Sequence, residues 1–302
     1  MSILRRLRES RNYSESELAE NIGVKTERVI EWEENSKEIS NHELSSLAYF
    51  FGLSSDDLRE SLREKEVKLT TNDYYIFADG FNDDGWWGHF GVRLKGHSNS
   101  MWFPITLGTA NQVSRVIRNL SYREEWMIVE TLNNRVLVMK PASVTRLWLL
   151  DDAQDQPGED WDIPIDGYSG QPGEFYRGLE EYCEEWCESG EDGVSEFVMS
   201  KVNEFTDAHD LGICEVRKMV LETQIYNLEG VEFSHDVDES KLAEIVTGIE
   251  TEFPDLIFDF SNDNYDLYIP SDEICLINMS RRNLENGMKV IHRDMEFHED
   301  EE

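Results

Sequence analysis

Five residues between positions 25 and 31 have side chains suited to contact with DNA bases and phosphates. They are Lys25, Thr26, Glu27, Arg28 and Glu31. An arginine can bind guanine through two hydrogen bonds, a threonine can contact a phosphate or a thymine methyl group, and a glutamate can accept from the amino group of cytosine. Side chains of these types can contact nucleic acid where their place in the fold allows it.

A second group combines cations with aromatic rings between residues 86 and 140. Its members are Trp86, Trp87, Arg93, Lys95, Arg115, Arg118, Arg135 and Lys140. Rings interleaved with cations on strands can stack exposed bases, and residues 126–150 also resemble, over some 25 residues, the Sm-like RNA-binding barrel, without a glycine in the turn. Two other uses stay open. The group can belong to an ordinary core with its polar faces outward, or it can form a surface that docks the acidic residues 151–192 of the same chain or of its dimer mate.

Residues that bind metals or perform catalysis form no familiar motif. Cys183 and Cys187 are four residues apart, with His209 and Cys214 downstream, but the pair lacks the knuckle of a zinc site. The histidines are scattered, and no glycine-rich phosphate loop is present. We therefore expect no metal, no cofactor and no enzymatic activity.

The N-terminal residues have the pattern of five short helices. Ser14 precedes Glu17 by three residues, which is the spacing of a capping box. Gly23 ends this helix, and Gly52 ends a later one. We predict an all-α head over residues 1–63, followed by a polar linker at 64–73.

The stretch from Ser14 to Asn35 resembles the helix-turn-helix of the phage-repressor family, the Cro, lambda-repressor and xenobiotic-response-element type. The matching positions pack the two helices together and turn the chain between them: Leu18, Ala19, Gly23, Val24, Val29 and Trp32. The resemblance continues through Leu58 and covers about a fifth of the chain. It implies that residues 25–34 enter the major groove, and that Glu15 stands where the family often has a glutamine that anchors to the DNA backbone or reads a base.

The charge of residues 25–34 departs from what DNA binding favours. Lys25 and Arg28 stand against Glu27, Glu31 and two further glutamates. A helix that faces phosphates gains affinity from positive charge. The alternative that the head keeps the fold but contacts protein therefore stays open.

The whole chain is strongly acidic, with a net charge of −36 over 302 residues. Residues 85–150 have eight basic and three acidic residues, whereas 151–192 have one basic and fifteen acidic ones. The electrostatic field of so acidic a chain repels nucleic acid, so DNA binding should be local and sensitive to salt. Four cysteines, no signal peptide and no apolar run near ~18 residues indicate a cytoplasmic protein without membrane contact.

Residues 74–150 and 213–295 share one order of predicted elements: two strands, a helix and three strands. The helices are expected at 108–120 and 239–250, and the first strands at 74–77 and 216–226. A proline, Pro141 or Pro270, precedes each last strand. We predict an α+β multidomain chain with two similar ββαβββ modules from an internal duplication, the alternative being a chance likeness of two generic patterns.

Residues 151–212 separate the modules as an acidic loop and helices. Apolar residues recur at three and four positions within 174–188, which predicts a packed helix with an acidic outer face, and a second helix is expected within 193–212. Residues 296–302 are expected to form a disordered acidic tail.

Two functions fit these patterns. The first is a transcriptional regulator of a bacterium or phage, such as a repressor, in which a homodimer binds duplex DNA through the heads while the C-terminal body senses a ligand or partner. The second is an acidic interaction protein, such as a DNA mimic, antagonist or antitoxin-like partner, whose head is not used for DNA. It would use residues 151–192 and the acidic second module to occupy a basic protein surface.

Overall fold

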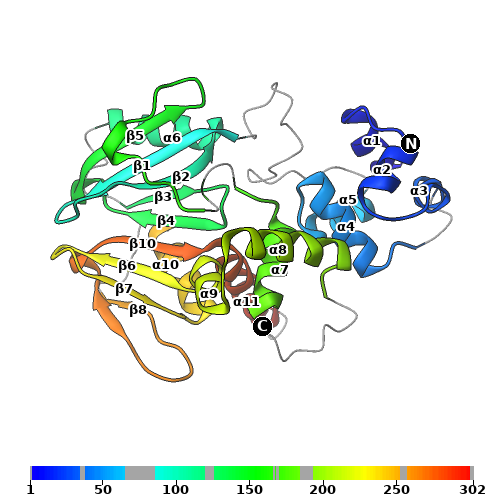
Figure 1. The fold of residues 1–302 in the computed structure, drawn as a ribbon. Helices are drawn as coiled ribbons and strands as arrows, with labels where there is room; N and C mark the ends of the chain where they lie inside the picture. Colours follow the sequence, from blue (N-terminus) through cyan, green and yellow to red (C-terminus); the bar gives the residue numbers. More distant parts are fainter. Residues whose placement is uncertain are drawn as a thin grey trace. The chain divides into compact units, whose positions relative to one another are not determined.

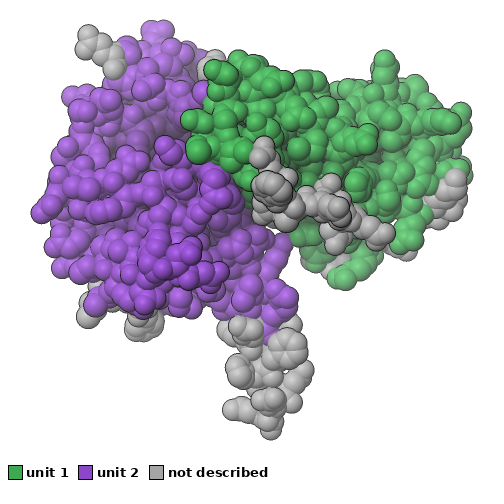
Figure 2. All heavy atoms as spheres, turned by 60° about the horizontal axis from the view of Figure 1, so that its bottom comes forward, with its two compact units in different colours: residues 1–86, 170–216 green, residues 87–169, 217–302 purple. Residues whose placement is uncertain are grey.

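The structure is a computed structural model that describes residues 2–34, 38–64, 86–119, 126–165, 167, 170–183, 193–251 and 257–299. These residues form an α+β protein with a helical head, as expected (Figure 1). The chain divides into two compact units, each made of two separate segments (Figure 2). Unit 1 contains residues 1–86 and 170–216, and unit 2 contains residues 87–169 and 217–302. Most of the predicted linker and the strand predicted at 74–77 lie outside the described residues.

Unit 1 begins with the five helices predicted for the head. Their bounds are α1 Ile3–Ser10, α2 Glu15–Asn21, α3 Thr26–Glu33, α4 Asn41–Phe51 and α5 Ser55–Glu64. Ser14 and Ser40 begin α2 and α4 with complete capping boxes, and Gly52 ends α4 with a φ of 72°. A single buried cluster, with Leu18, Val29 and other apolar residues of all five helices, holds the head together. Local signals therefore set the helix ends, and apolar burial packs the helices.

Two later helices complete unit 1: α7 Gly173–Cys183 and α8 Glu196–His209. Both contact α4, and the rings of Tyr49 and Phe197 meet edge to face at 5.5 Å. Ser45 and Ser46 are consequently buried although they are polar. The segment 151–212, which sequence analysis treated as one part, contributes residues 151–169 to unit 2 and residues 170–212 to unit 1.

Unit 2 contains two larger antiparallel sheets and a small hairpin. The first sheet has the order β2-β1-β5, with bounds β1 Trp86–Leu94, β2 Met101–Thr106 and β5 Val144–Asp151. The second has the order β3-β4-β10-β6-β7, with bounds β3 Met127–Glu130, β4 Arg135–Met139, β6 Thr223–Asn227, β7 Glu232–His235 and β10 Ile274–Ser280. The hairpin pairs β8 Ile257–Asp259 with β9 Tyr268–Pro270.

The five-stranded sheet lies between two hydrophobic cores. Neighbouring residues of a strand point to opposite faces, so Leu276 of β10 joins the core shared with the three-stranded sheet and α6 (Leu107–Arg118), while Ile277 joins the other core. That second core is completed by α10 Glu239–Glu250 and α11 Arg281–Glu299. Gly287 allows these helices to approach closely, because a Cβ there would lie 2.0 Å from the carbonyl oxygen of Glu239.

The predicted ββαβββ order is present in both halves of unit 2. Strand pairing repeats as well, since β2-β1-β5 in the first half corresponds to β7-β6-β10 in the second, and the hairpin β3-β4 corresponds to β8-β9. A short 3-10 turn precedes each last strand, at Pro141–Ser143 and Ser271–Glu273. These matching pairings support the duplication. The halves differ in that β10 also pairs with β4, which joins both modules in one sheet.

Three sequence-based expectations differ from the structure. The strand predicted at 216–226 is instead α9 Ile213–Val220 followed by β6, because Val216 and Val220 are both buried at helical spacing. Residues 296–299 belong to α11, where a disordered tail was expected. The Sm-like resemblance is wrong as a fold, because β5 pairs with β1 in another sheet and does not continue from β4.

Candidate DNA interface and ligand pocket

Helices α2 and α3 form the predicted helix-turn-helix. Gly23 takes a φ of 73° in the turn, a conformation that favours glycine. Val29 and Trp32 are buried and anchor α3 on the core of the head. Lys25, at the N-terminal cap of α3, is exposed, as is Glu27, whereas Thr26 is half-buried.

Arg28, predicted to bind guanine, is held by other residues of the head. Its Nε lies 2.7 Å from Oε1 of Glu43, and its Nη2 lies 2.8 Å from Oε2 of the same carboxylate. Nη2 also donates to the carbonyl of Glu38 at 2.9 Å, and the guanidinium lies over the ring of Trp32. The side chain is 25% exposed. To contact DNA, Arg28 must therefore either release the Glu43 carboxylate or bind Glu43 and DNA at the same time.

Glu15, predicted to contact DNA, is bound by Arg8. The Nη2 of Arg8 lies 2.9 Å from Oε1 of Glu15, and Arg8 also makes two hydrogen bonds to Glu33, at 2.6 and 2.9 Å. The side chains of Arg8 and Glu33 are each 5% exposed. This cluster fixes α1, α2 and α3 relative to one another and holds Glu15 in place, although one third of its side chain stays exposed.

The solvent-exposed side of α3 is predominantly acidic and partly apolar. Lys25 and Glu27 share it with Ile30, which is 41% exposed, and with Glu31, whose carboxylate lies 3.6 Å from Arg28. Sequence reasoning missed Ile30, although its place three residues after Glu27 could have indicated it. The DNA contacts of Lys25, Thr26, Glu27 and Glu31 stay predictions.

Two of the basic residues predicted for the surface of 86–140 donate to backbone carbonyls within unit 2. Arg135 is buried, and its guanidinium donates to the carbonyls of Glu222 and Lys218. Lys140 donates to the carbonyl of Ser271 at 2.7 Å and lies over a tryptophan ring. Three cations of the group are exposed and two tryptophans are half-buried: Lys95, Arg115, Arg118, Trp86 and Trp87.

Arg93, another member of this group, docks part of the acidic segment. Its Nη2 lies 2.6 Å from Oδ1 of Asp160. The same carboxylate accepts from the backbone N–H of Ser100 at 3.0 Å and from its hydroxyl at 2.8 Å, and Trp102 donates to the Asp160 carbonyl. Burial by itself raises the pKa of the Asp160 carboxyl, but the hydrogen bonds from Arg93 and Ser100 outweigh burial and lower this pKa to about 2.

This low pKa predicts how the stability of unit 2 depends on pH. A carboxyl whose folded pKa lies below its ordinary value of 3.8 stabilises the fold above that value and loses the contribution as pH falls toward 2. We expect Asp160→Asn to be less stable than the wild type at neutral pH, with the difference in free energy of unfolding narrowing between about pH 4 and about pH 2. Denaturant unfolding followed by tryptophan fluorescence measures this.

The exposed Asp152 in the same segment offers the control. Asp152→Asn should leave the free energy of unfolding nearly unchanged, since surface substitutions without a buried partner have small effects. If the wild type and Asp160→Asn differ as much at low pH as at neutral pH, the Asp160 carboxylate is not the source of the difference.

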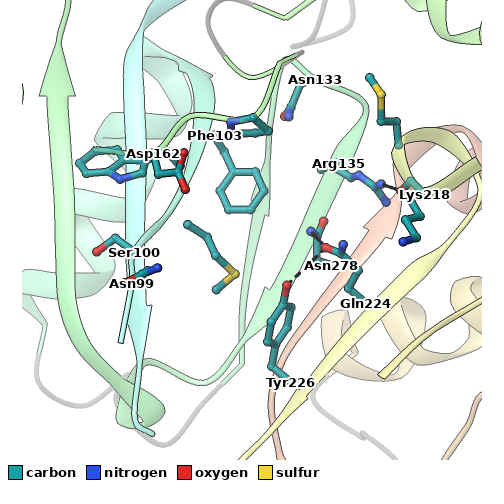
Figure 3. A pocket seen from close by; sticks show the side chains of 14 residues that line it. Asn99, Ser100, Phe103, Asn133, Arg135, Asp162, Lys218, Gln224, Tyr226 and Asn278 are labelled. Atoms are coloured by element: carbon teal, nitrogen blue, oxygen red, sulfur yellow. Dashed lines mark hydrogen bonds between the residues drawn. The ribbon is translucent and has the colours of Figure 1, made fainter. Parts of the chain in front are cut away.

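Unit 2 also contains a pocket of about 420 Å³ (Figure 3). Its lining comes from the start of β2, the turn before β4, α9 and the central strands of the five-stranded sheet. Amide, hydroxyl and charged groups line it together with the rings of Phe103 and Tyr226. Local sequence patterns do not reveal this pocket, because residues that line it, such as Arg135 and Asn278, lie 143 positions apart in the chain.

The described residues contain neither a cluster suited to a metal ion nor a membrane-spanning helix. No group of three or more His, Cys, Asp or Glu side chains there is placed to hold a metal ion. Cys183 is half-buried, Cys214 is exposed and Cys275 is buried, while Cys187 lies outside the described residues. Within the same part of the chain, no helix is long and apolar enough to cross a membrane.

Comparison with known proteins identifies the N-terminal domain. The family model described as helix-turn-helix matches residues 4–58. The expected Cro and lambda-repressor type of domain is thereby confirmed for this part of the chain, and the match supports a DNA-binding regulator in general. No curated protein and no solved structure matches the chain.

Proposed function

We propose that this protein is a cytoplasmic transcriptional regulator whose head binds duplex DNA through α3 and whose unit 2 binds a regulatory ligand without transforming it. The helix-turn-helix frame, matched over residues 4–58, carries the proposal. Two heads in a homodimer would double the few cations that each head offers to phosphates, which an acidic chain needs for useful affinity.

Arg28 differs from the other residues of the proposed interface, because its side chain is held by Glu43. Lys25, Thr26 and Glu27, at the start of α3, are free to approach base edges and phosphates. Arg28 is bound to Glu43 by two short hydrogen bonds. A DNA phosphate therefore competes with Glu43 for the guanidinium, and this competition lowers affinity.

The proposal is tested by selection of bound fragments from genomic DNA with the full-length protein at two salt concentrations. A regulator selects a shared sequence, and its affinity falls as salt rises, because counterions return to the phosphates. If the protein selects no fragment even at low salt, the regulator function is wrong for this chain.

Glu43→Gln is expected to raise affinity for duplex DNA about tenfold at low salt. It should also steepen the salt dependence of this affinity by the amount that about one additional phosphate contact produces. Glutamine at this position can preserve the capping box with Ser40 that begins α4. It removes the charge that holds Arg28, so the guanidinium becomes available to a phosphate. Fluorescence anisotropy with a labelled duplex at several salt concentrations measures both effects.

The matched control is Glu20→Gln, which makes the same change of net charge at an exposed position of α2. Its effect on affinity should be smaller than that of Glu43→Gln. Adding Arg28→Ala to Glu43→Gln should abolish the gain. A Glu43→Gln protein that binds DNA no better than the Glu20→Gln protein shows that Arg28 stays outside the interface.

A second candidate function is an acidic interaction protein that does not use its head for DNA. The acidic side of α3, with Glu27 and Glu31 beside the exposed Ile30, favours contact with a basic protein surface. The selection experiment separates the two functions. Failure to select DNA, together with retained affinity for a basic protein, would favour this second function.

A further inference from the structure

Polar side chains occupy the centre of the five-stranded sheet in unit 2. Asn278 of β10 pairs in register with Gln224 of β6 on one side and with Leu137 of β4 on the other. It is 5% exposed. Burying an amide costs free energy unless each polar atom is hydrogen-bonded, so a central strand ordinarily has an apolar residue at such a position.

The hydrogen bonds of this amide pair are incomplete. The Nδ2 of Asn278 donates to Oε1 of Gln224 at 2.6 Å, and the hydroxyl of Tyr226 lies 3.4 Å from the same oxygen. The Oδ1 of Asn278 is buried and has no hydrogen-bond partner among the described residues. Asn278, Gln224 and Tyr226 all line the pocket and lie close together in it (Figure 3). A ligand with a hydrogen-bond donor would satisfy this oxygen.

Cations lie beside these amides. Arg135 and Lys218 both line the pocket, and the two carbonyls to which Arg135 donates are neutral acceptors that hold its guanidinium in place. Lys218 is exposed on α9. The acidic residue of the lining, Asp162, is also exposed. The pocket lining thus has two positive charges and one negative charge, a net of +1 in a protein whose net charge is −36, and this excess favours an anionic group on the ligand.

Aromatic rings supply flat surfaces in the same pocket. The ring of Phe103, from β2, lies among the other labelled side chains of the pocket (Figure 3). Tyr226 of β6 supplies a second ring, and both residues are buried while lining the pocket. A volume of about 420 Å³ lies in the range of small-molecule sites. Rigid rings of this kind favour a planar ligand.

We propose that this pocket binds a nucleoside 5′-monophosphate, a ligand that joins a flat hydrogen-bonding base to an anionic phosphate. Asn278 and Gln224 contact the edge of the base, as carboxamides do when they read adenine. Phe103 and Tyr226 pack against the planar part of the ligand, and Lys218 and Arg135 bind the phosphate. The proposal rests on the proposed regulatory function and names the class of its ligand.

The test uses the full-length protein and isothermal titration calorimetry with AMP, GMP, CMP and UMP, with the four nucleosides and inorganic phosphate as comparisons. At least one monophosphate should bind with a Kd below about 100 μM, and its nucleoside and inorganic phosphate should bind at least about tenfold more weakly. The proposal is overturned if no monophosphate binds at about 1 mM, or if phosphate alone or the nucleoside alone binds as tightly. The measurement contains no DNA, so its failure is distinct from failure of DNA selection.

Two variants test whether the monophosphate binds in this pocket. Lys218→Met should weaken binding of the monophosphate about tenfold, whereas Lys289→Met, an equal charge change at an exposed site on α11 outside the lining, should not. Replacing Gln224 and Asn278 together by leucine should abolish binding while the protein stays folded, because both hydrogen-bond partners are removed as a pair. Because Lys218 is exposed, its variant tests the proposal even if the double variant does not fold. Unchanged binding by Lys218→Met would place the ligand elsewhere.

Discussion

Arg8→Ala is expected to destabilise the helices of the head by about 3–5 kcal/mol, the usual effect of removing one partner of a buried ion pair. Arg8 donates to both oxygens of Glu33, at 2.6 and 2.9 Å, and to the carbonyl of Tyr13 at 2.6 Å. A hydrogen bond to Glu33 also raises the pKa of Arg8, so the guanidinium keeps its charge. Without it, the Glu33 carboxylate, 5% exposed, would be left without this countercharge.

Hydrogen exchange followed by mass spectrometry is the suitable measurement, because it reports separately on the helices of the head and on unit 2. Peptides from α1, α2 and α3 should lose protection in Arg8→Ala, while peptides from unit 2 should not. The control is Arg6→Ala on the same helix, whose side chain is exposed. Substitutions of exposed side chains usually change the free energy of unfolding by about 0.5 kcal/mol or less. Equal protection in both variants would show that Arg8 does not hold the helices together.

Glu174→Ala should destabilise unit 1 by roughly 2–4 kcal/mol, since it removes charge-assisted hydrogen bonds from a buried site. Glu174, at the start of α7, is 1% exposed. Its Oε2 accepts from the hydroxyl of Ser45 at 2.8 Å, and its Oε1 accepts from the backbone N–H of Ser55 at 2.8 Å. Alanine would leave a cavity and a buried N–H without its partner.

The same exchange measurement should show lost protection in α4, α5 and α7. Glu204→Ala on α8 provides the control, because that side chain is 65% exposed and pairs with Lys201. Glu174→Gln should retain part of the stability, since an amide oxygen can still accept one of these hydrogen bonds. Protection that is unaffected in Glu174→Ala would mean that α7 contributes little to the head.

The role of Glu174 also affects how DNA binding should be measured. Ser45 and Ser55 belong to helices of the family-matched head, yet their partner lies 119 or more positions away in the sequence. A fragment that ends after α5 exposes Ser45, Tyr49 and the start of α5, which α7 and α8 otherwise contact. DNA binding is therefore better tested with the full chain.

The sequence by itself determined the helices of the head and most strands of the body. Ser14 with Glu17, Ser40 with Glu43 and Gly52 place helix ends through hydrogen bonds and backbone preferences that act within a few residues. The helix predicted at 239–250 has those bounds in the structure, because Asp238 begins it and buried residues recur at helical spacing. The repeated ββαβββ order was also readable from local patterns.

Predictions of helices and strands were wrong where a local pattern fits more than one structure. Residues 216–220 have branched apolar residues that suit a strand or a buried helix, and packing of Val216 and Val220 selected the helix. The start of α11 was missed because Leu284, Met288 and Ile291 are separated by charged residues, and their helical spacing gains meaning only against α10.

Tertiary structure alone decided the partners of the charged and polar side chains. The sequence supplied Arg28 as a candidate DNA contact, but Glu43, fifteen positions later, determines whether its guanidinium is available. Arg8 and Glu33 are 25 positions apart, and β4 pairs with β10 across more than 130 residues. Caps and periodicity act between neighbours in the chain, whereas ion pairs, sheet order and the pocket depend on which distant segments the hydrophobic cores bring together.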